Sequence, residues 1–130
     1  MKYILVFFVL VSSTCFAQTQ AELNKQEHNN YLKADKELNA IYNSILRLYE
    51  PDIVFISNLK KSQKLWMQFR DAELKLKYPD REPGYYGSAQ QMCRSIYLTE
   101  LTTQRINTLK TWVDGIEEGD VCSGSVRWKD

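Results

Sequence analysis

The stretch QKLWMQFRD, residues 63–71, decides how this chain can fold. Gln63, Trp66 and Arg70 recur at helical spacing on one side, and Asp71 stands beside the arginine. A helix face that mixes aromatic, amide and charged side chains is neither an apolar core stripe nor a plain solvated surface. Three interpretations are open at this point: a catalytic site, a binding surface, or a polar part of the interior.

Apolar residues on both sides of this stretch predict two long helices. Residues 19–22, TQAE, have the form of a capping box, so the first helix is expected over about residues 20–49. Proline disfavours helix at the residue before it, so Pro51 separates the two helices and Pro79 ends the second. The expected stripes are Tyr31, Ala34, Leu38, Ile41, Tyr42, Ile45, Leu48 and Tyr49, then Phe55, Ile56, Leu59, Trp66, Phe69 and Leu74.

A third helix follows a loop, residues 79–87, that is rich in proline and glycine. Residues 88–91, SAQQ, form a second capping box, and Gly115 is a typical residue to end a helix. Residues 116–130 show no sustained period, and nothing reads as a strand. The prediction is an all-α, three-helix up-down-up bundle with an irregular C-terminal tail. The third stripe is Met92, Ile96, Thr99, Thr103, Ile106 and Leu109, with Leu98, Leu101 and Trp112 on its flank.

Residues 1–17 have the features of a secretory signal peptide. Lys2 precedes an apolar run, residues 3–11, that is too short to span a bilayer, and small residues favour cleavage between Ala17 and Gln18. A lipoprotein anchored at Cys15 is less favoured, because the residues before this cysteine fit poorly. We therefore expect a periplasmic or secreted protein whose single helical domain is residues 18–130.

The charge balance argues against nucleic acid as a partner. Losing Lys2 from the 17 basic residues leaves 16, against 16 acidic residues, so the mature chain is formally neutral. A nucleic-acid-binding domain would carry a basic patch. No second apolar run is long enough to cross a membrane.

The sequence offers little catalytic chemistry. His28 is the only histidine, and no CxxC, HExxH, GxGxxG or GxSxG motif occurs. Two cysteines and one distant histidine do not make a zinc site. The glycines in PGYYGS, residues 83–88, lack the lysine of a phosphate-binding loop. We expect neither an enzyme nor a bound metal or cofactor.

The predicted topology places polar residues of three helices at one height. A turn near residues 50–51 brings Asn39 opposite Gln63, and the later loop brings Arg105 level with residues 61–63. Buried polar groups need partners, so such convergence predicts mutual hydrogen bonding that fixes the register of the bundle.

Arg70 is expected about two turns away from that layer, near Tyr31 and Asp35, with Asp35 or Asp71 supplying the opposite charge. An exposed polar cleft that binds a ligand remains the alternative interpretation.

Four segments in this order carry a family resemblance: LNAIY (38–42), QKLWMQFRD (63–71), the loop before SAQQMC (88–93), and LTELTTQRINTL (98–109). Together they resemble the LprI-like lysozyme inhibitors, a family of small secreted bacterial proteins. Many members have cysteines near the positions of Gln26 and Leu74, and this chain has neither. The matching positions are Leu38, Asn39, Tyr42, Gln63, Trp66, Arg70, Asp71, Cys93, Thr102, Arg105 and Leu109.

The resemblance implies a protein that inhibits lysozyme by occluding it. A periplasmic module that binds some other protein is the alternative, and an enzyme remains only a residual possibility. Two segments are candidates for the partner contact, although each is also typical of a solvated tail or a packed loop. They are the tyrosines of the loop, Tyr85 and Tyr86, and the acidic cluster Asp114, Glu117, Glu118 and Asp120.

Cys93 and Cys122 are the cysteines left in the mature chain, and an oxidising compartment favours a disulfide between them. About 30 Å of helix separates Cys93 from Val113. The residues from Asp114 to Cys122 can retrace that distance only if they are nearly extended. We therefore expect the tail to run back antiparallel along the third helix.

Overall fold

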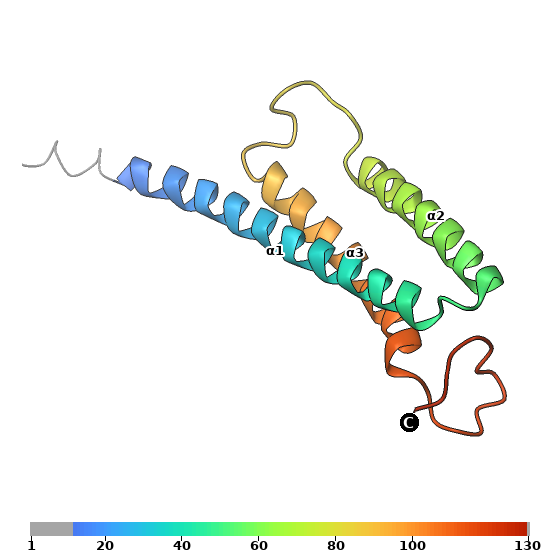
Figure 1. Cartoon of the computed structure of the whole chain (residues 1–130). Helices are drawn as coiled ribbons and strands as arrows, with labels where there is room; N and C mark the ends of the chain where they lie inside the picture. The colour runs from blue at the N-terminus through green and yellow to red at the C-terminus, as the bar shows by residue number, and fades with distance from the viewer. Residues whose placement is uncertain (1–11, 130) are drawn as a thin grey trace, which may run out of the picture.

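The computed structural model describes the backbone of residues 12–129 and the side chains from residue 19 onward. Most of the predicted signal peptide, residues 1–11, lies outside the described residues. The described chain forms three helices, α1 (Ser12–Leu48), α2 (Ile53–Lys77) and α3 (Gln90–Asp114). The order of the helices and the up-down-up course in Figure 1 confirm the predicted all-α fold.

The helices do not contribute equally to the bundle. α1 packs along α3, and the two run side by side in the same direction (Figure 1). α2 returns antiparallel to both, and its backbone comes close to α3 at only a few points. α2 is therefore held to the other helices by long side chains.

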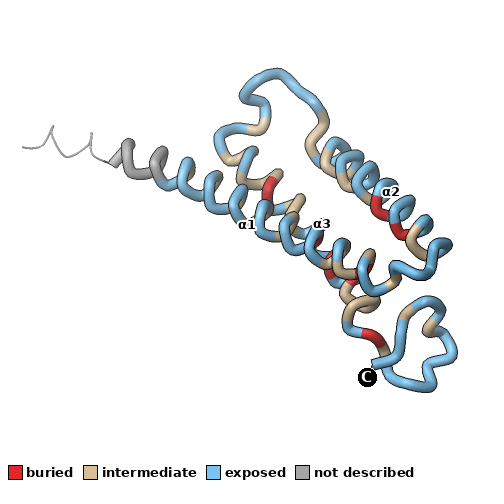
Figure 2. Tube along the Cα trace, viewed as in Figure 1, coloured by how far each residue is buried: buried red, intermediate tan, exposed pale blue. Residues whose placement is uncertain are grey.

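A small apolar core joins all three helices. Leu38 and Ile45 from α1, Leu59 from α2, and Ile106 and Leu109 from α3 form one buried cluster. Burying a side chain of this size stabilises the fold by about 1.5–3 kcal/mol. Buried positions are few along α2 (Figure 2), which agrees with its looser attachment.

The predicted apolar stripe of α3 is confirmed at Ile106 and Leu109, which are buried, but it is wrong by one residue at two other positions. Ile96 and Thr103 are exposed, whereas Ser95 and Thr102 are buried. Small side chains at these two buried positions let α3 lie close against α1. The face that packs is therefore set by close approach as well as by hydrophobicity.

The predicted capping boxes are also wrong. α1 starts at Ser12, so Thr19 lies inside the helix, where the amides that a cap would satisfy already lie within the helical ladder. α3 is capped by another helix. The Met92 amide donates to Asn24 Oδ1 at 3.2 Å, and Asn24 Nδ2 donates to the Ser88 carbonyl at 3.1 Å. The N-cap residue of α3, Ala89, has no side chain that could do this.

Two other helix ends agree with the sequence. The Asp52 side chain accepts a hydrogen bond from the Phe55 amide at 2.9 Å and caps α2 directly after Pro51. Gly115 ends α3 with a φ of 75°. A Cβ at this position would lie 3.0 Å from the Arg127 carbonyl oxygen, so the site requires glycine.

The tail folds at the end of α3 and does not run back along it. The Ile116 amide donates to the Arg127 carbonyl at 3.0 Å, and the Lys129 amide donates to the Ile116 carbonyl at 2.8 Å. The Arg127 amide also donates to the Tyr49 hydroxyl at 3.2 Å. These local bonds hold residues 116–129 far from the first turn of α3.

The predicted disulfide is therefore wrong, because Cys93 and Cys122 are both free thiols. Cys93 is half-buried in the first turn of α3, whereas Cys122 is exposed in the tail at the other end of that helix. Of the helices in the described part of the chain, none is long and apolar enough to cross a membrane.

Candidate functional site

One set of polar contacts between helices joins α2 to α3. Arg105 Nε donates to Gln63 Oε1 at 3.0 Å, and Arg105 Nη2 donates to Ser62 Oγ at 3.0 Å. Gln63 is only 7% exposed. The sequence prediction that Arg105 lies level with residues 61–63 is confirmed. We call Ser62, Gln63 and Arg105 the Arg105 cluster.

Arg105 lacks a charge partner. Among the described residues, no carboxylate forms an ion pair with its guanidinium. Burial lowers the pKa of Arg105 from its ordinary value, and no nearby acid offsets this effect. Its two described acceptors, Gln63 and Ser62, are both neutral groups.

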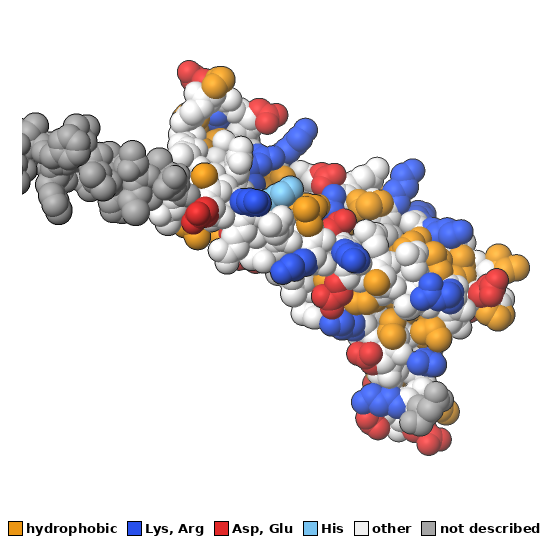
Figure 3. Space-filling model, turned by 60° about the vertical axis from the view of Figure 1, so that its left-hand side comes forward, with side chains coloured by type: hydrophobic (Ala, Val, Ile, Leu, Met, Phe, Trp, Pro, Cys, Tyr) orange, Lys and Arg blue, Asp and Glu red, His pale blue; other side chains and the backbone are white. Residues whose placement is uncertain are grey.

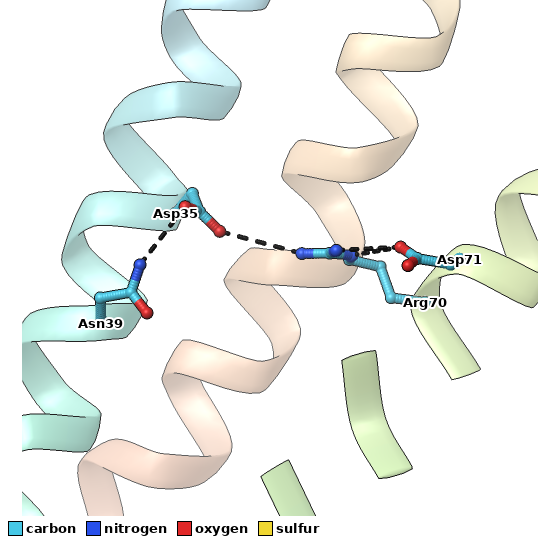
Figure 4. A network of polar contacts seen from close by, with 4 residues as sticks. All are labelled: Asp35, Asn39, Arg70 and Asp71. Carbon is cyan, nitrogen blue, oxygen red and sulfur yellow. Dashed lines mark hydrogen bonds and ion pairs between the residues drawn. The ribbon is translucent and has the colours of Figure 1, made fainter. Parts of the chain in front are cut away.

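A second polar group joins α2 to α1. Arg70 pairs with Asp71 at 2.9 Å and reaches Asp35 on α1 at 3.8 Å (Figure 4). Asn39 Nδ2 donates to Asp35 Oδ2 at 3.3 Å. We call Asp35, Asn39, Arg70 and Asp71 the Arg70 cluster. The prediction that Arg70 lies near Asp35 is confirmed.

The charges of the Arg70 cluster affect the pKa of Tyr31. Burial raises the pKa of Tyr31, Arg70 lowers it, and the carboxylates of Asp35 and Asp71 raise it again. The net direction is upward, because burial is the largest effect.

The predicted convergence of three helices is wrong for Asn39. This residue is exposed and bonds within α1, so it does not reach Gln63. Leu38 and Ile45 face the core, and the neighbouring Asn39 is consequently turned outward. The polar residues form two separate clusters instead of one layer.

Trp66 connects the two clusters. Its ring centroid lies 5.4 Å from the guanidinium carbon of Arg70 and 5.9 Å from that of Arg105. Trp66 also packs against the apolar core, as does Tyr42 of α1. One indole ring thus offers its π-system to a cation from α2 and a cation from α3.

An open groove lies beside the Arg105 cluster. It has a volume of about 400 Å³ and runs between the first half of α2, the second half of α3 and the tail. Trp112 Nε1 donates to Ser125 Oγ at 3.0 Å, which ties the tail to this groove. No pattern in the sequence indicated the groove, because its walls come from three segments that are distant in the chain. Its lining residues are Asp52, Val54, Phe55, Asn58, Leu59, Ser62, Arg105, Leu109, Trp112 and Ser125.

The loop between α2 and α3 holds one of its two tyrosines and exposes the other. The Tyr86 hydroxyl donates to the Pro79 carbonyl at 2.8 Å, and its ring packs edge-on against Tyr78. Tyr85 packs edge-on against Tyr86 and is still 65% exposed. The loop extends away from the helices (Figure 1). Tyr85 is therefore exposed to solvent while its ring packs against Tyr86.

The acidic cluster of the tail is exposed, and part of it forms contacts within the tail itself. Asp114, Glu117, Glu118 and Asp120 all face solvent. Lys129 Nζ lies 2.6 Å from Glu117, and the Cys122 amide donates to Asp120 Oδ1 at 2.8 Å. Two of the four carboxylates thus already have partners within the tail.

The described residues include no group of three His, Cys, Asp or Glu side chains that could hold a metal ion. His28 is exposed near the middle of α1. The features that bear on function are the polar contacts between helices, the groove beside the Arg105 cluster, and the two projecting segments.

These features define a small all-α protein in which arginines, an amide and a shared tryptophan tie three helices together. The family described as lysozyme inhibitor LprI matches residues 13–109. The match covers most of the chain, and the protein belongs to this family. No curated protein and no solved structure matches the chain.

Proposed function

We propose that this protein is a secreted or periplasmic, non-enzymatic inhibitor of lysozyme that occludes the cleft of the enzyme. The observation that carries the proposal is the match to the lysozyme inhibitor LprI family over residues 13–109. These residues include all but the first residue of α1, the whole of α2, the loop before α3 and most of α3.

The loop between α2 and α3 has the right shape for this role. Lysozyme works with two carboxylates that flank the sugar chain in a cleft, and a cleft is blocked by a projecting element. The described surface offers two such elements, the loop and the tail (Figure 1). Exposed aromatic side chains such as Tyr85 are typical anchors of protein interfaces.

The loop is favoured over the acidic tail for two reasons. The family match ends at residue 109, so residues 79–87 lie inside the matched part and residues 115–130 lie outside it. In addition, Glu117 is already paired with Lys129. The contact surface is therefore expected to lie in the loop, with Tyr85 as its anchor.

The test is a lysozyme assay on bacterial cell walls with purified residues 18–130. We expect inhibition at micromolar concentration, and we expect Tyr85→Ala to raise the half-inhibitory concentration by about tenfold or more. Phe69→Ala is the matched control, since it truncates another exposed aromatic residue, on α2. It should leave the inhibition unchanged.

Replacing the four tail acids by Asn and Gln separates the two segments. If the tail made the contact, this variant would lose inhibition, and inhibition by the wild type would weaken as salt rises. A large molar excess that leaves several lysozyme types fully active would contradict the proposal.

The outer face of α2 favours a second candidate, a periplasmic module that binds another protein. Val54, Leu65, Phe69 and Leu76 lie on one side of α2 and are each between 53% and 72% exposed. Lysines 61, 64 and 75 flank them, so this surface suits an acidic partner better than a basic lysozyme. Hydrophobic and basic side chains are interspersed toward the end opposite the N-terminus (Figure 3).

A further inference from the structure

Arg105 has donors to spare beside the groove. A guanidinium carries five N–H donors, and the two contacts to Gln63 and Ser62 leave several of them free of described partners. Arg105 and Ser62 are both part of the groove lining, so this end of the groove is positively charged. A partly buried charge without a counter-ion favours the binding of an anion.

The rest of the groove is mainly apolar. Val54, Phe55 and Leu59 form the wall on α2, and Leu109 and Trp112 form the wall on α3. From Ser62 to Asp52 the groove follows α2 for about ten residues, or about 15 Å at the helical rise. A volume of about 400 Å³ lies within the range of small-molecule sites.

We propose that this groove binds a small carboxylic acid with an apolar body, whose carboxylate lies against Arg105. The apolar body extends along α2 and α3 toward Val54 and Trp112. A carboxylate matches the planar guanidinium and can accept two parallel hydrogen bonds from it.

The opposite end of the groove fixes the direction of the ligand. Asp52 lines that end, and its carboxylate accepts the capping bond from the Phe55 amide. A negative charge there disfavours a second anion, so the ligand carries one carboxylate and enters with its apolar end toward Asp52.

The size of the groove favours a small acid over a segment of a partner protein. Stable protein interfaces bury more than about 1,000 Å² and extend well beyond one pocket. The groove is lined by the first residues of α2, whereas the loop that carries Tyr85 follows the other end of this helix (Figure 1). The proposal is therefore independent of lysozyme inhibition.

Octanoate, 1-octanol and octylammonium are suitable probes, since they share one apolar chain and differ in charge. Binding to residues 18–130 is measured by calorimetry and by tryptophan fluorescence, because Trp112 lines the groove. We expect saturable binding of octanoate at one site, at least about tenfold tighter than that of the other two probes.

Three variants test the site. Arg105→Gln should weaken octanoate about tenfold and leave octanol unchanged. Lys110→Gln is the matched control, because it also removes a positive charge from α3. Lys110 is paired with Glu37 at 2.9 Å and does not line the groove. This variant should leave octanoate binding unchanged. Asn58→Trp places a large ring in the groove and keeps Arg105, so it should weaken octanoate and octanol alike.

Thermal melts show whether each variant is folded. If Arg105→Gln does not fold, Asn58→Trp still tests whether octanoate binds in the groove, and the comparison of octanoate with octanol still tests the role of the carboxylate. Equal affinity for octanoate and octanol would overturn the proposal. So would octanoate binding that survives Asn58→Trp, or the absence of saturable binding by the wild type.

Discussion

Thr102 is the most deeply buried polar side chain among the described residues, and its hydroxyl has no hydrogen-bond partner there. The residue lies on the face of α3 that packs against the core, between Leu101 and the buried Ile106. An unsatisfied buried hydroxyl costs about 1–3 kcal/mol. Thr102 therefore fits its site by shape and not by polarity.

Replacing this hydroxyl by a methyl group should stabilise the protein. We expect Thr102→Val to raise the free energy of unfolding by about 1 kcal/mol, because the shape is kept and the unsatisfied group is removed. Thr102→Ser keeps the hydroxyl and deletes the methyl, so it should lower the free energy of unfolding by about 1 kcal/mol. Urea denaturation measures both values. A destabilised Thr102→Val protein would mean that the hydroxyl does have a partner in solution.

At the scale of elements, α2 is the helix with the weakest support. Leu59 and Gln63 are its only buried residues, whereas α3 buries five. Its links to the other helices are mostly long side chains: Arg105 reaches it from α3, and Arg70 reaches from it to α1. Such contacts break one by one more easily than a continuous packed face.

Hydrogen exchange should expose this difference. We expect the amides of α2 to exchange at least about tenfold faster than those of residues 101–109 in α3, since local opening of α2 uncovers little apolar surface. Mass spectrometry of deuterated peptides from residues 18–130 measures both regions in one sample. Equal protection of α2 and α3 would show that the three helices open as a single unit.

At the scale of the whole molecule, stability should depend on pH on the alkaline side. Tyr31 on α1 and Tyr78 at the end of α2 both have a raised pKa, and burial is the largest cause in each case. The folded state therefore holds these protons more tightly than the unfolded state does. This contribution is fully present below about pH 10 and is lost as the pH rises through the folded-state values.

We expect the melting temperature to fall as the pH rises from about 10 to about 12, and we expect Tyr31→Phe to lose less over the same range. The phenylalanine cannot ionise, so its variant lacks the Tyr31 share of the effect. Absorbance at alkaline pH follows the tyrosines directly. Identical losses for the wild type and Tyr31→Phe would assign the pH dependence to other groups.

The sequence by itself determined the number, order and direction of the helices. Apolar periodicity and breakers such as Pro51, Pro79 and Gly115 are local signals, and they act in the same way in any tertiary context. Counting along antiparallel helices also placed Arg105 beside Gln63, because the helical rise is nearly constant. The family resemblance rested on these same segments and is confirmed by the match over residues 13–109.

Only the tertiary structure decided which faces meet and where the tail goes. Rotation about a helix axis is set by close packing with the other helices, and this packing turned Asn39 outward and buried Ser95 and Thr102. Contacts between distant segments did the rest. Asn24 caps α3 from α1, Tyr49 helps to hold the tail away from Cys93, and three segments together enclose the groove beside Arg105. Each of these depends on atoms that are brought together only after the helices pack, so no local pattern in the sequence encodes it.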